Sequence, residues 1–261
     1  ILNDMPVFWD EEMLKQNIHA VRWPKGIPTR FAVIPRYGST DEIRWFDAEP
    51  TSVLHWLNAF EEGDEVVLDG YFQEEPVPGN YEGAPQGYER MMAYLDQELL
   101  KPRLHRWRFN LATGETREER LDDRTLEFGT INQRRGGQAY RFAYSAIPKA
   151  GWFLFTGFTK HDLESGDSWS YELGPNRYGS EAAFAPRVGA TREDDGYLVS
   201  FVSDLDADRS EAVLIDASDV SAGPVCRIIL PHRICSGTHA TWGHGEDIRR
   251  AQAVAAEEKA A

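Results

Sequence analysis

The sequence has few cysteines, little positive charge and no long apolar run. Its 261 residues include two cysteines, and 28 Lys and Arg residues stand against 43 Asp and Glu residues, for a formal net charge of −15. This charge repels phosphate groups and anionic lipid head groups, so we expect no nucleic-acid partner. No apolar stretch approaches the roughly 18 residues that a membrane-spanning helix needs.

The two cysteines, Cys226 and Cys235, form no Cys-x-x-Cys pair and have no metal-ligand spacing with a histidine. Because disulfides persist mainly in oxidising compartments, we expect two reduced, buried thiols in a cytoplasmic protein, with peripheral membrane contact left open. Common catalytic motifs are missing as well. The chain has no Gly-x-Ser-x-Gly, no His-Glu-x-x-His and no Gly-rich phosphate loop.

Hydrophobic residues make up 41% of the chain and aromatic residues 12%, which is enough to bury a core. Short β-branched and aromatic segments alternate with Gly, Pro, Asp and Ser, which predicts strands separated by turns, among them 31–35, 43–46, 53–57 and 66–72.

Two helical segments are predicted. Apolar residues recur at helical spacing over Tyr88–Leu100 and stop before Pro102, so we expect one short helical insertion near 88–100. The segment Ile248–Ala261, rich in Ala, Glu and Arg, predicts a helical or disordered tail after a domain of residues 1–247.

A strand–turn–strand pattern recurs three times. Apolar strands run into turns at Asn110, Asp162 and Asp216, and a return strand follows each turn. The three turn residues lie about 52 and 54 positions apart, near the length of a propeller blade. The pattern predicts an all-β propeller, in which innermost strands converge on one axis and bring distant residues together.

Two histidines lie in settings that hold an imidazole rigidly. His55 is in the apolar, strand-like run Val53–Leu57, and His239 follows the turn at Gly237 among small residues that allow close approach to an axis. Imidazole is both a common metal ligand and a common hydrogen-bonded core group. Each histidine alone therefore leaves both interpretations open.

Two glutamates, Glu127 and Glu181, have apolar or small neighbours. A buried acid is costly unless a partner satisfies it. The ring N–H of a metal-bound histidine is one such partner, since a carboxylate orients that ring and makes it more basic. A turn cap or an arginine such as Arg187 is an equally good alternative.

In this order the segments resemble the carotenoid cleavage oxygenases, in particular their bacterial members. The resemblance covers Ile1 to about Trp242, and its motifs are His55 with Asn58–Glu61, Glu127–Asn132, Ser180–Arg187, Glu193–Val199 and Gly237–Trp242. It implies a seven-bladed β-propeller. The chain would be its C-terminal portion and form an incomplete ring.

The family resemblance also implies a non-haem Fe(2+) ion held by four histidines. By matching motifs, His55 and His239 are the third and fourth metal ligands, and Glu127 and Glu181 orient them. The other two ligands have no counterpart in this chain, so we expect the chain alone to bind iron weakly and to be inactive. The implied dioxygenase cleaves a C=C bond of a carotenoid, apocarotenoid or stilbene-like substrate with O2, giving two carbonyl products.

The sequence departs from the family pattern in three ways: Thr238 and Ala240 flank His239 where Phe and Gly are usual, Ala182 follows Glu181 where Pro is common, and Gly129 replaces another common Pro. We expect these changes to affect pocket shape more than metal binding.

Two other classes of function stay open. The first is a metal-free propeller that acts as a binding module. The second is a propeller hydrolase that uses Glu127 and Glu181 as an acid/base pair. Aromatic residues such as Trp45, Phe46, Trp56 and Phe60 suit either a substrate tunnel or, more simply, core packing.

Overall fold

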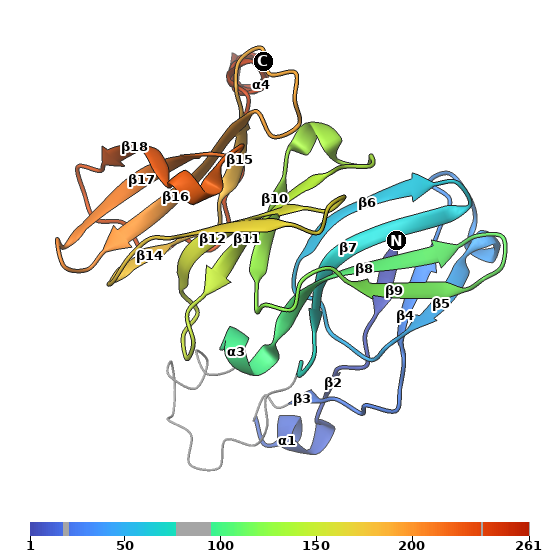
Figure 1. Cartoon of the computed structure of the whole chain (residues 1–261). Coiled ribbons are helices and arrows are strands. Elements are labelled where there is room, and N and C mark those ends of the chain that lie inside the picture. Colours follow the sequence, from blue (N-terminus) through green and yellow to red (C-terminus); the bar gives the residue numbers. More distant parts are fainter. Residues whose placement is uncertain (18–20, 77–94, 236, 261) are drawn as a thin grey trace.

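The computed structural model of the chain describes residues 1–17, 21–76, 95–235 and 237–260. Antiparallel strands dominate this part of the chain, which confirms the predicted all-β class (Figure 1). The described residues form four sheets, of three, nine, two and four strands, and none of the four closes on itself.

The four-stranded sheet is an antiparallel meander in the order β6-β7-β8-β9. Its first two strands are joined at Gly63, whose φ of 60° lies in the left-handed region that favours glycine. The strands are β6 (Trp56–Glu62), β7 (Glu65–Gln73), β8 (Pro102–Asn110) and β9 (Thr116–Arg120).

Two further meanders lie within the nine-stranded sheet. One is β10 (Glu127–Ile131), β11 (Phe142–Pro148), β12 (Phe155–Asp162) and β13 (Ser168–Glu172), and the other is β15 (Ala183–Pro186), β16 (Gly196–Asp204), β17 (Arg209–Asp216) and β18 (Pro224–Ile229). Strand β14 (Arg177–Gly179) pairs with both β12 and β16 and so joins the two.

The predicted repeat is confirmed by the turns of the three meanders. Asn110, Asp162 and Asp216 each end the third strand of a meander, namely β8, β12 and β17. In each case the side-chain Oδ1 accepts a hydrogen bond from the backbone N–H two residues further on, at 2.9, 3.1 and 2.9 Å. This is the local bond by which Asn and Asp favour turns.

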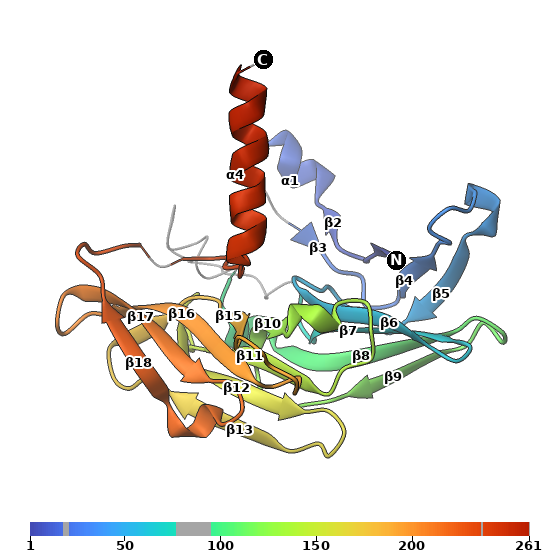
Figure 2. The same ribbon diagram turned by 90° about the horizontal axis from the view of Figure 1, so that it is seen from above.

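The remaining elements are short, apart from the last helix. The three-stranded sheet consists of β1 (Leu2–Asp4), β4 (Thr29–Val33) and β5 (Arg44–Ala48), and the two-stranded sheet pairs β2 (Phe8–Trp9) with β3 (Val21–Arg22). The described helices are α1 (Glu11–Lys15), α3 (Gln97–Leu100) and α4 (Gly245–Ala260). The 3-10 turns are η1 (Thr40–Glu42), η2 (Gln133–Arg135) and η3 (Val220–Ala222). Figure 2 shows α1 and α4 projecting from the same side of the sheets.

The predicted helical insertion is found in part. Helix α3 covers its last four residues, and positions 88–94 lie outside the described part of the chain. The helix ends because Lys101 adopts a left-handed φ of 51° and Pro102 already belongs to β8. The predicted C-terminal tail is a helix, α4, that begins at Gly245. The domain boundary at residue 247 stays a prediction. Among the described helices, none is long and apolar enough to cross a membrane.

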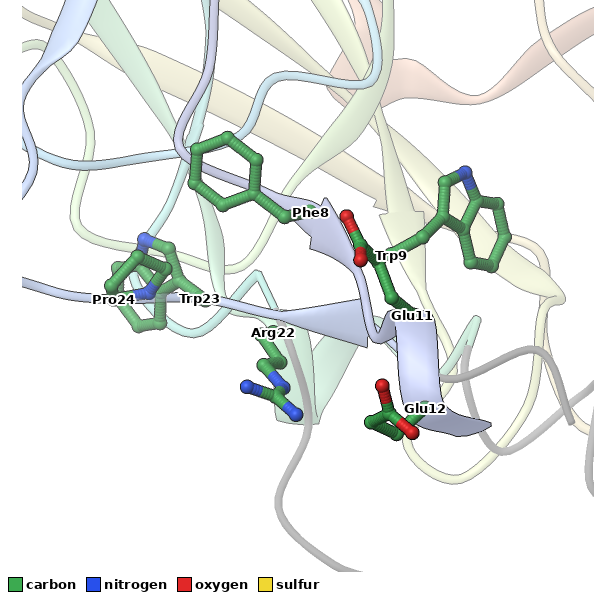
Figure 3. A pocket seen from close by; sticks show the side chains of 7 residues that line it. All are labelled: Phe8, Trp9, Glu11, Glu12, Arg22, Trp23 and Pro24. Carbon is green, nitrogen blue, oxygen red and sulfur yellow. The ribbon is translucent and has the colours of Figure 1, made fainter. Parts of the chain in front are cut away.

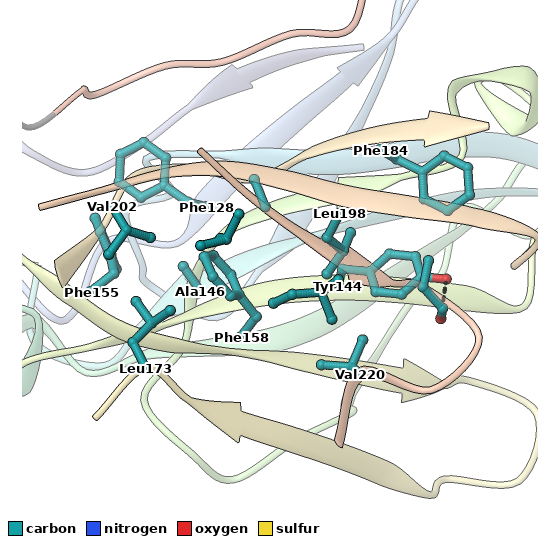
Figure 4. Packing of buried hydrophobic residues seen from close by; sticks show 14 residues of the cluster. Phe128, Tyr144, Ala146, Phe155, Phe158, Leu173, Phe184, Leu198, Val202 and Val220 are labelled. Carbon is teal, nitrogen blue, oxygen red and sulfur yellow. Dashed lines mark hydrogen bonds between the residues drawn. The ribbon is translucent and has the colours of Figure 1, made fainter. Parts of the chain in front are cut away.

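The largest apolar cluster lies between the strands of the nine-stranded sheet and η3 (Figure 4). It includes Phe128, Phe155 and Phe158, each at most 2% exposed. A second cluster around Phe31, Phe46 and Trp107 joins the three-stranded and four-stranded sheets. The first cluster packs the second meander against the third, and a smaller cluster around Phe60, Val67 and Ile131 packs the first against the second.

Several predictions about single residues are corrected. His55 lies one residue before β6, not inside a strand, because the pairing of β6 with β7 shifts register between Trp56 and Asn58. Cys226 and Cys235 are free, but both are exposed instead of buried, since β18 pairs with β17 alone. Of the four aromatic candidates, three belong to the core: Phe46 and Phe60 are buried, and Trp56 packs against the core. Trp45 is half-exposed.

Candidate metal centre

The four residues predicted to form a metal centre meet in space. His55 lies in the segment before β6, and His239 lies in the segment between β18 and α4. Their imidazole rings have centroids 5.2 Å apart and planes inclined at 78°. The fold therefore brings together two histidines from nearly opposite ends of the described chain.

The carboxylate of Glu127 orients His55. Oε2 of Glu127 lies 2.7 Å from Nδ1 of His55, and the same oxygen accepts a hydrogen bond from the backbone N–H of Phe128. Glu127 is the first residue of β10 and is 0% exposed. Its other oxygen, Oε1, is buried without a hydrogen-bond partner among the described residues. A buried, partly unsatisfied carboxylate is typical of a functional site.

The carboxylate of Glu181 makes the equivalent contact with His239. Oε2 of Glu181 lies 3.2 Å from Nδ1 of His239 and accepts a hydrogen bond of 2.6 Å from the backbone N–H of Ala240. Glu181 lies between β14 and β15 and its side chain is 16% exposed, whereas that of His239 is 64% exposed. A Cβ at Gly237 would meet Ser180 at an ordinary 3.5 Å, so this approach does not depend on a glycine.

Burial is the largest single influence on the pKa of both Glu127 and His55. It raises the pKa of the Glu127 carboxyl, against the opposing effects of His55 and the Phe128 N–H. Burial alone would lower the pKa of His55, but the hydrogen bond and the charge of Glu127, together with the charge of Glu181, outweigh it and raise that pKa. Both groups of the pair therefore bind a proton more readily than they would alone in water.

These contacts leave the other ring nitrogens available. Both histidines face a carboxylate through Nδ1, and Nε2 of neither ring has a hydrogen bond to a described residue. A histidine that donates Nδ1–H to a carboxylate and binds metal through Nε2 is the usual arrangement at metal sites. Within the described ranges, no group of three or more His, Cys, Asp or Glu side chains could hold a metal ion. The described residues thus fit part of a histidine shell.

Of the alternative partners considered for the two glutamates, the arginine is otherwise engaged, since Arg187 contacts Asp195 at 2.7 Å and Asp216 at 3.2 Å. The backbone contacts are present together with the histidine contacts, because Oε2 of each glutamate also accepts a backbone N–H, that of Phe128 or of Ala240. Glu127 is 0% exposed, which disfavours its direct contact with the substrate of a hydrolase. His105 and His161 pair with Glu118 and Asp122, away from this centre.

One residue of the centre was missed by sequence reasoning. Phe128 has a positive φ of 50°, and its ring centroid lies 4.3 Å from that of His55 and 5.4 Å from that of His239. A phenylalanine within an apolar strand predicts core packing, and no pattern in the sequence marks the left-handed backbone.

A cavity of about 650 Å³ lies elsewhere, between α1 and the β2–β3 pair (Figure 3). None of the four candidate residues lines it. Its lining consists of Phe8, Trp9, Glu11, Glu12, Arg22, Trp23 and Pro24.

Comparison with known proteins shows the family of the chain. The family described as "Retinal pigment epithelial membrane protein" matches residues 1–244. Carotenoid 9,10(9',10')-cleavage dioxygenase 1 of Phaseolus vulgaris is 34% identical over 92% of this chain and 46% of its own length. The carotenoid cleavage oxygenase of Mycobacterium tuberculosis is 33% identical over 84% of this chain and 43% of its own length. Isoeugenol monooxygenase of Pseudomonas putida is 32% identical over 91% of this chain and 51% of its own length.

Solved structures share the fold. A variant of the apocarotenoid oxygenase of Synechocystis superposes with a TM-score of 0.81 at 24% identity, over 93% of this chain and 50% of the other. The cobalt-substituted form of that enzyme gives a TM-score of 0.78, again at 24% identity, with the same coverage. The chain thus spans about half the length of the relatives it matches.

The fold and the paired His–Glu contacts define an all-β protein with a candidate histidine metal centre. The chain belongs to the carotenoid cleavage oxygenase family, as its match over residues 1–244 shows.

Proposed function

We propose that this chain is the C-terminal part of a dioxygenase that cleaves a C=C bond of a carotenoid, apocarotenoid or stilbene-like substrate with O2 and releases two carbonyl products. One observation carries the proposal. The rings of His55 and His239, each held by its own carboxylate, have centroids 5.2 Å apart. Such a pair, with Nε2 of each ring left for a ligand bond, is half of the four-histidine shell implied by the family.

We infer that the metal is Fe(2+). Imidazole nitrogens bind several transition metals, so the two histidines alone do not select iron. The resemblance to the family implies that choice. Bound Fe(2+) would activate O2 beside the alkene.

The residues of this chain would hold and insulate that ion. Glu127 and Glu181 face Nδ1 of His55 and His239, so Nε2 of each ring is the atom that would bind the metal. Phe128 supplies an apolar wall next to both rings. Oxidative cleavage of an alkene requires no protein acid or base, which agrees with the lack of a catalytic triad motif in the sequence.

The seven-bladed ring is part of the proposal. Three successive four-stranded meanders, β6 to β9, β10 to β13 and β15 to β18, support it as consecutive blades. The remaining blades and the two other histidine ligands would come from residues beyond this chain. The chain on its own should therefore bind iron weakly and be inactive.

The substrate would be a small apolar molecule with a conjugated C=C bond. The names of the relatives support this, since carotenoids and isoeugenol both contain such a bond. The proposed location is cytoplasmic, with peripheral contact to a membrane from which a lipid substrate is taken up.

Product analysis of the full-length protein tests the function. The protein, loaded with iron, is incubated with an apocarotenoid or a stilbene-like alkene under isotopically labelled oxygen gas. The carbonyl products are reduced at once so that their oxygen cannot exchange with water. Two products, each carrying one labelled oxygen atom, are expected. An intact alkene, or label in only one product, would contradict the proposed dioxygenase.

A His239→Ala variant should lose the activity, and His232→Ala, a change in the same connecting segment, should keep it. Activity that survives in the first variant would refute the ligand role. A metal-free binding module, the other candidate class, would bind the alkene without consuming oxygen.

A further inference from the structure

Two consecutive residues of β10 contact the same imidazole. Glu127 hydrogen-bonds to Nδ1 of His55, and the ring of Phe128 lies 4.3 Å from the His55 ring, centroid to centroid. In a regular strand, successive side chains point to opposite faces of the sheet, so both could not reach one ring.

The backbone is irregular at this point. The pairing of β10 with β11 shifts register between Glu127 and Thr130, and Phe128 has a φ of 50°. A left-handed conformation is unfavourable for a bulky residue, and such strain is found at functional sites where the surroundings over-determine it. The irregularity turns the Phe128 side chain toward the same side as Glu127.

The Phe128 ring lies against both histidines. Its centroid is 5.4 Å from that of His239, and its other neighbours are Phe155 at 4.9 Å and Phe153 at 5.6 Å. Phe128 itself is 2% exposed, and it is packed in the largest apolar cluster. The side chain of His239, in contrast, is 64% exposed, and its other contacts are Glu181 at Nδ1 and the ring of His55.

We propose that Phe128 is a positioning residue, whose ring fixes the angle between the imidazoles of His55 and His239 so that both present Nε2 to one metal ion. The carboxylates set which nitrogen is free, and Phe128 sets how the two ring planes meet. The inference rests on the proposed metal site and adds to it a residue that touches neither the metal nor O2.

Cobalt(II) titration of the full-length protein tests this role, because the visible absorption of bound Co(II) reports the geometry of its ligands. The matched pair of variants is Phe128→Ala and Phe155→Ala. Both remove a phenyl ring that is 2% exposed from the same cluster, but Phe155 has no ring contact with either histidine. The unfolding temperature should fall by a similar amount in both variants.

We expect Phe128→Ala to weaken Co(II) binding about tenfold and to change the shape of the Co(II) spectrum, a loss typical of residues that orient metal ligands. Phe155→Ala should keep both the affinity and the spectrum of the wild type. Equal affinities and spectra in the two variants would overturn the inference.

Two further variants separate the ring from the backbone. Phe128→Gly tolerates a positive φ and removes the ring, so it should behave as Phe128→Ala does toward cobalt. Phe128→Leu keeps apolar volume without a flat ring, and serves if Phe128→Ala does not fold. Wild-type affinity and spectrum in either one would overturn the proposal. A wild-type protein that binds no cobalt would instead contradict the proposed metal site itself.

Discussion

The carboxylate of Glu127 lies 2.7 Å from Nδ1 of His55, across a sequence separation of 72 residues. The acid begins β10 in one meander, whereas the histidine precedes β6 in the meander before it. The contact therefore joins two adjacent meanders, each of which contributes one residue to the candidate centre. Its geometry also determines that Nε2, and not Nδ1, is the nitrogen left for a metal.

Replacement of Glu127 by glutamine should weaken metal binding. Glu127→Gln keeps the shape of the side chain but removes the charge that makes His55 a better ligand, so we expect affinity in the full-length protein to fall about 10- to 100-fold. Glu118→Gln is the control, because Glu118 also contacts a histidine, Nε2 of His105 at 3.1 Å, outside the centre. Equal affinities in both variants, measured by metal titration, would refute the orienting role.

Replacement of Gly129 by any larger residue is predicted to destabilise the fold for a steric reason. A Cβ at this position would lie 2.3 Å from the hydroxyl of Tyr71 and 2.6 Å from Cδ1 of Leu57. Because Tyr71 is fully buried, it cannot move away easily. We expect Gly129→Ala to lower the free energy of unfolding by about 1 to 3 kcal/mol, the range of overpacked cores, as measured by urea denaturation.

Two variants make that prediction specific. Gly26→Ala adds a methyl group where no atom lies within 4 Å, and should leave stability nearly unchanged. Adding Tyr71→Phe to Gly129→Ala removes the closest atom, so the double variant should lose less stability than the sum of the single changes. Simple additivity would show that the hydroxyl is not the obstacle.

The buried pair of Asp69 and Arg106 should contribute strongly to stability. Arg106 donates two hydrogen bonds to Asp69, at 2.8 and 2.9 Å, and Tyr140 donates a third of 2.6 Å. Asp69→Asn leaves the Arg106 charge buried without its counter-ion, which costs about 3 to 5 kcal/mol in such pairs. Glu12→Gln, which breaks the exposed pair with Lys15, should have little measurable effect in the same denaturation experiment.

The contribution of Asp162 should depend on pH. The hydrogen bonds from Arg141 lower the pKa of the Asp162 carboxyl from 3.8 to about 2, although burial opposes the shift. A lowered folded-state pKa means that the ionised group stabilises the protein above about pH 4 and that this stability is lost as the pH falls toward 2.

Asp162→Asn isolates the charge, since asparagine keeps the turn that Asn110 forms in the first repeat. The variant should be less stable than the wild type by roughly 1 kcal/mol at pH 7, after allowance for solvent screening at the half-exposed Arg141, and the difference should shrink as the pH is lowered from 4 to 3. A difference that does not change with pH would contradict the assignment to the Asp162 charge.

Local chemistry explains what could be predicted from the sequence. The turns at Asn110, Asp162 and Asp216 were predictable because each is formed by bonds between a side chain and its own neighbouring backbone. The candidates His55 and His239 were found through family motifs, and the predicted propeller already implied that they would meet. The distance and the angle between the two rings came only from the assembled sheets.

Features that depend on tertiary context were missed. The register shift that leaves His55 outside β6 and the left-handed backbone at Phe128 both arise from pairing with a neighbouring strand, which no local pattern encodes. The cysteines were predicted to be buried from residue type alone, but Cys226 lies on β18, a strand with one partner.

The central claim, that His55 and His239 bind one metal ion, is tested most directly by the iron content of the full-length protein and of three variants. We predict one iron per chain in the wild type and in His232→Ala, and a large loss in both His55→Ala and His239→Ala. Iron content that is the same in all four proteins would contradict the account.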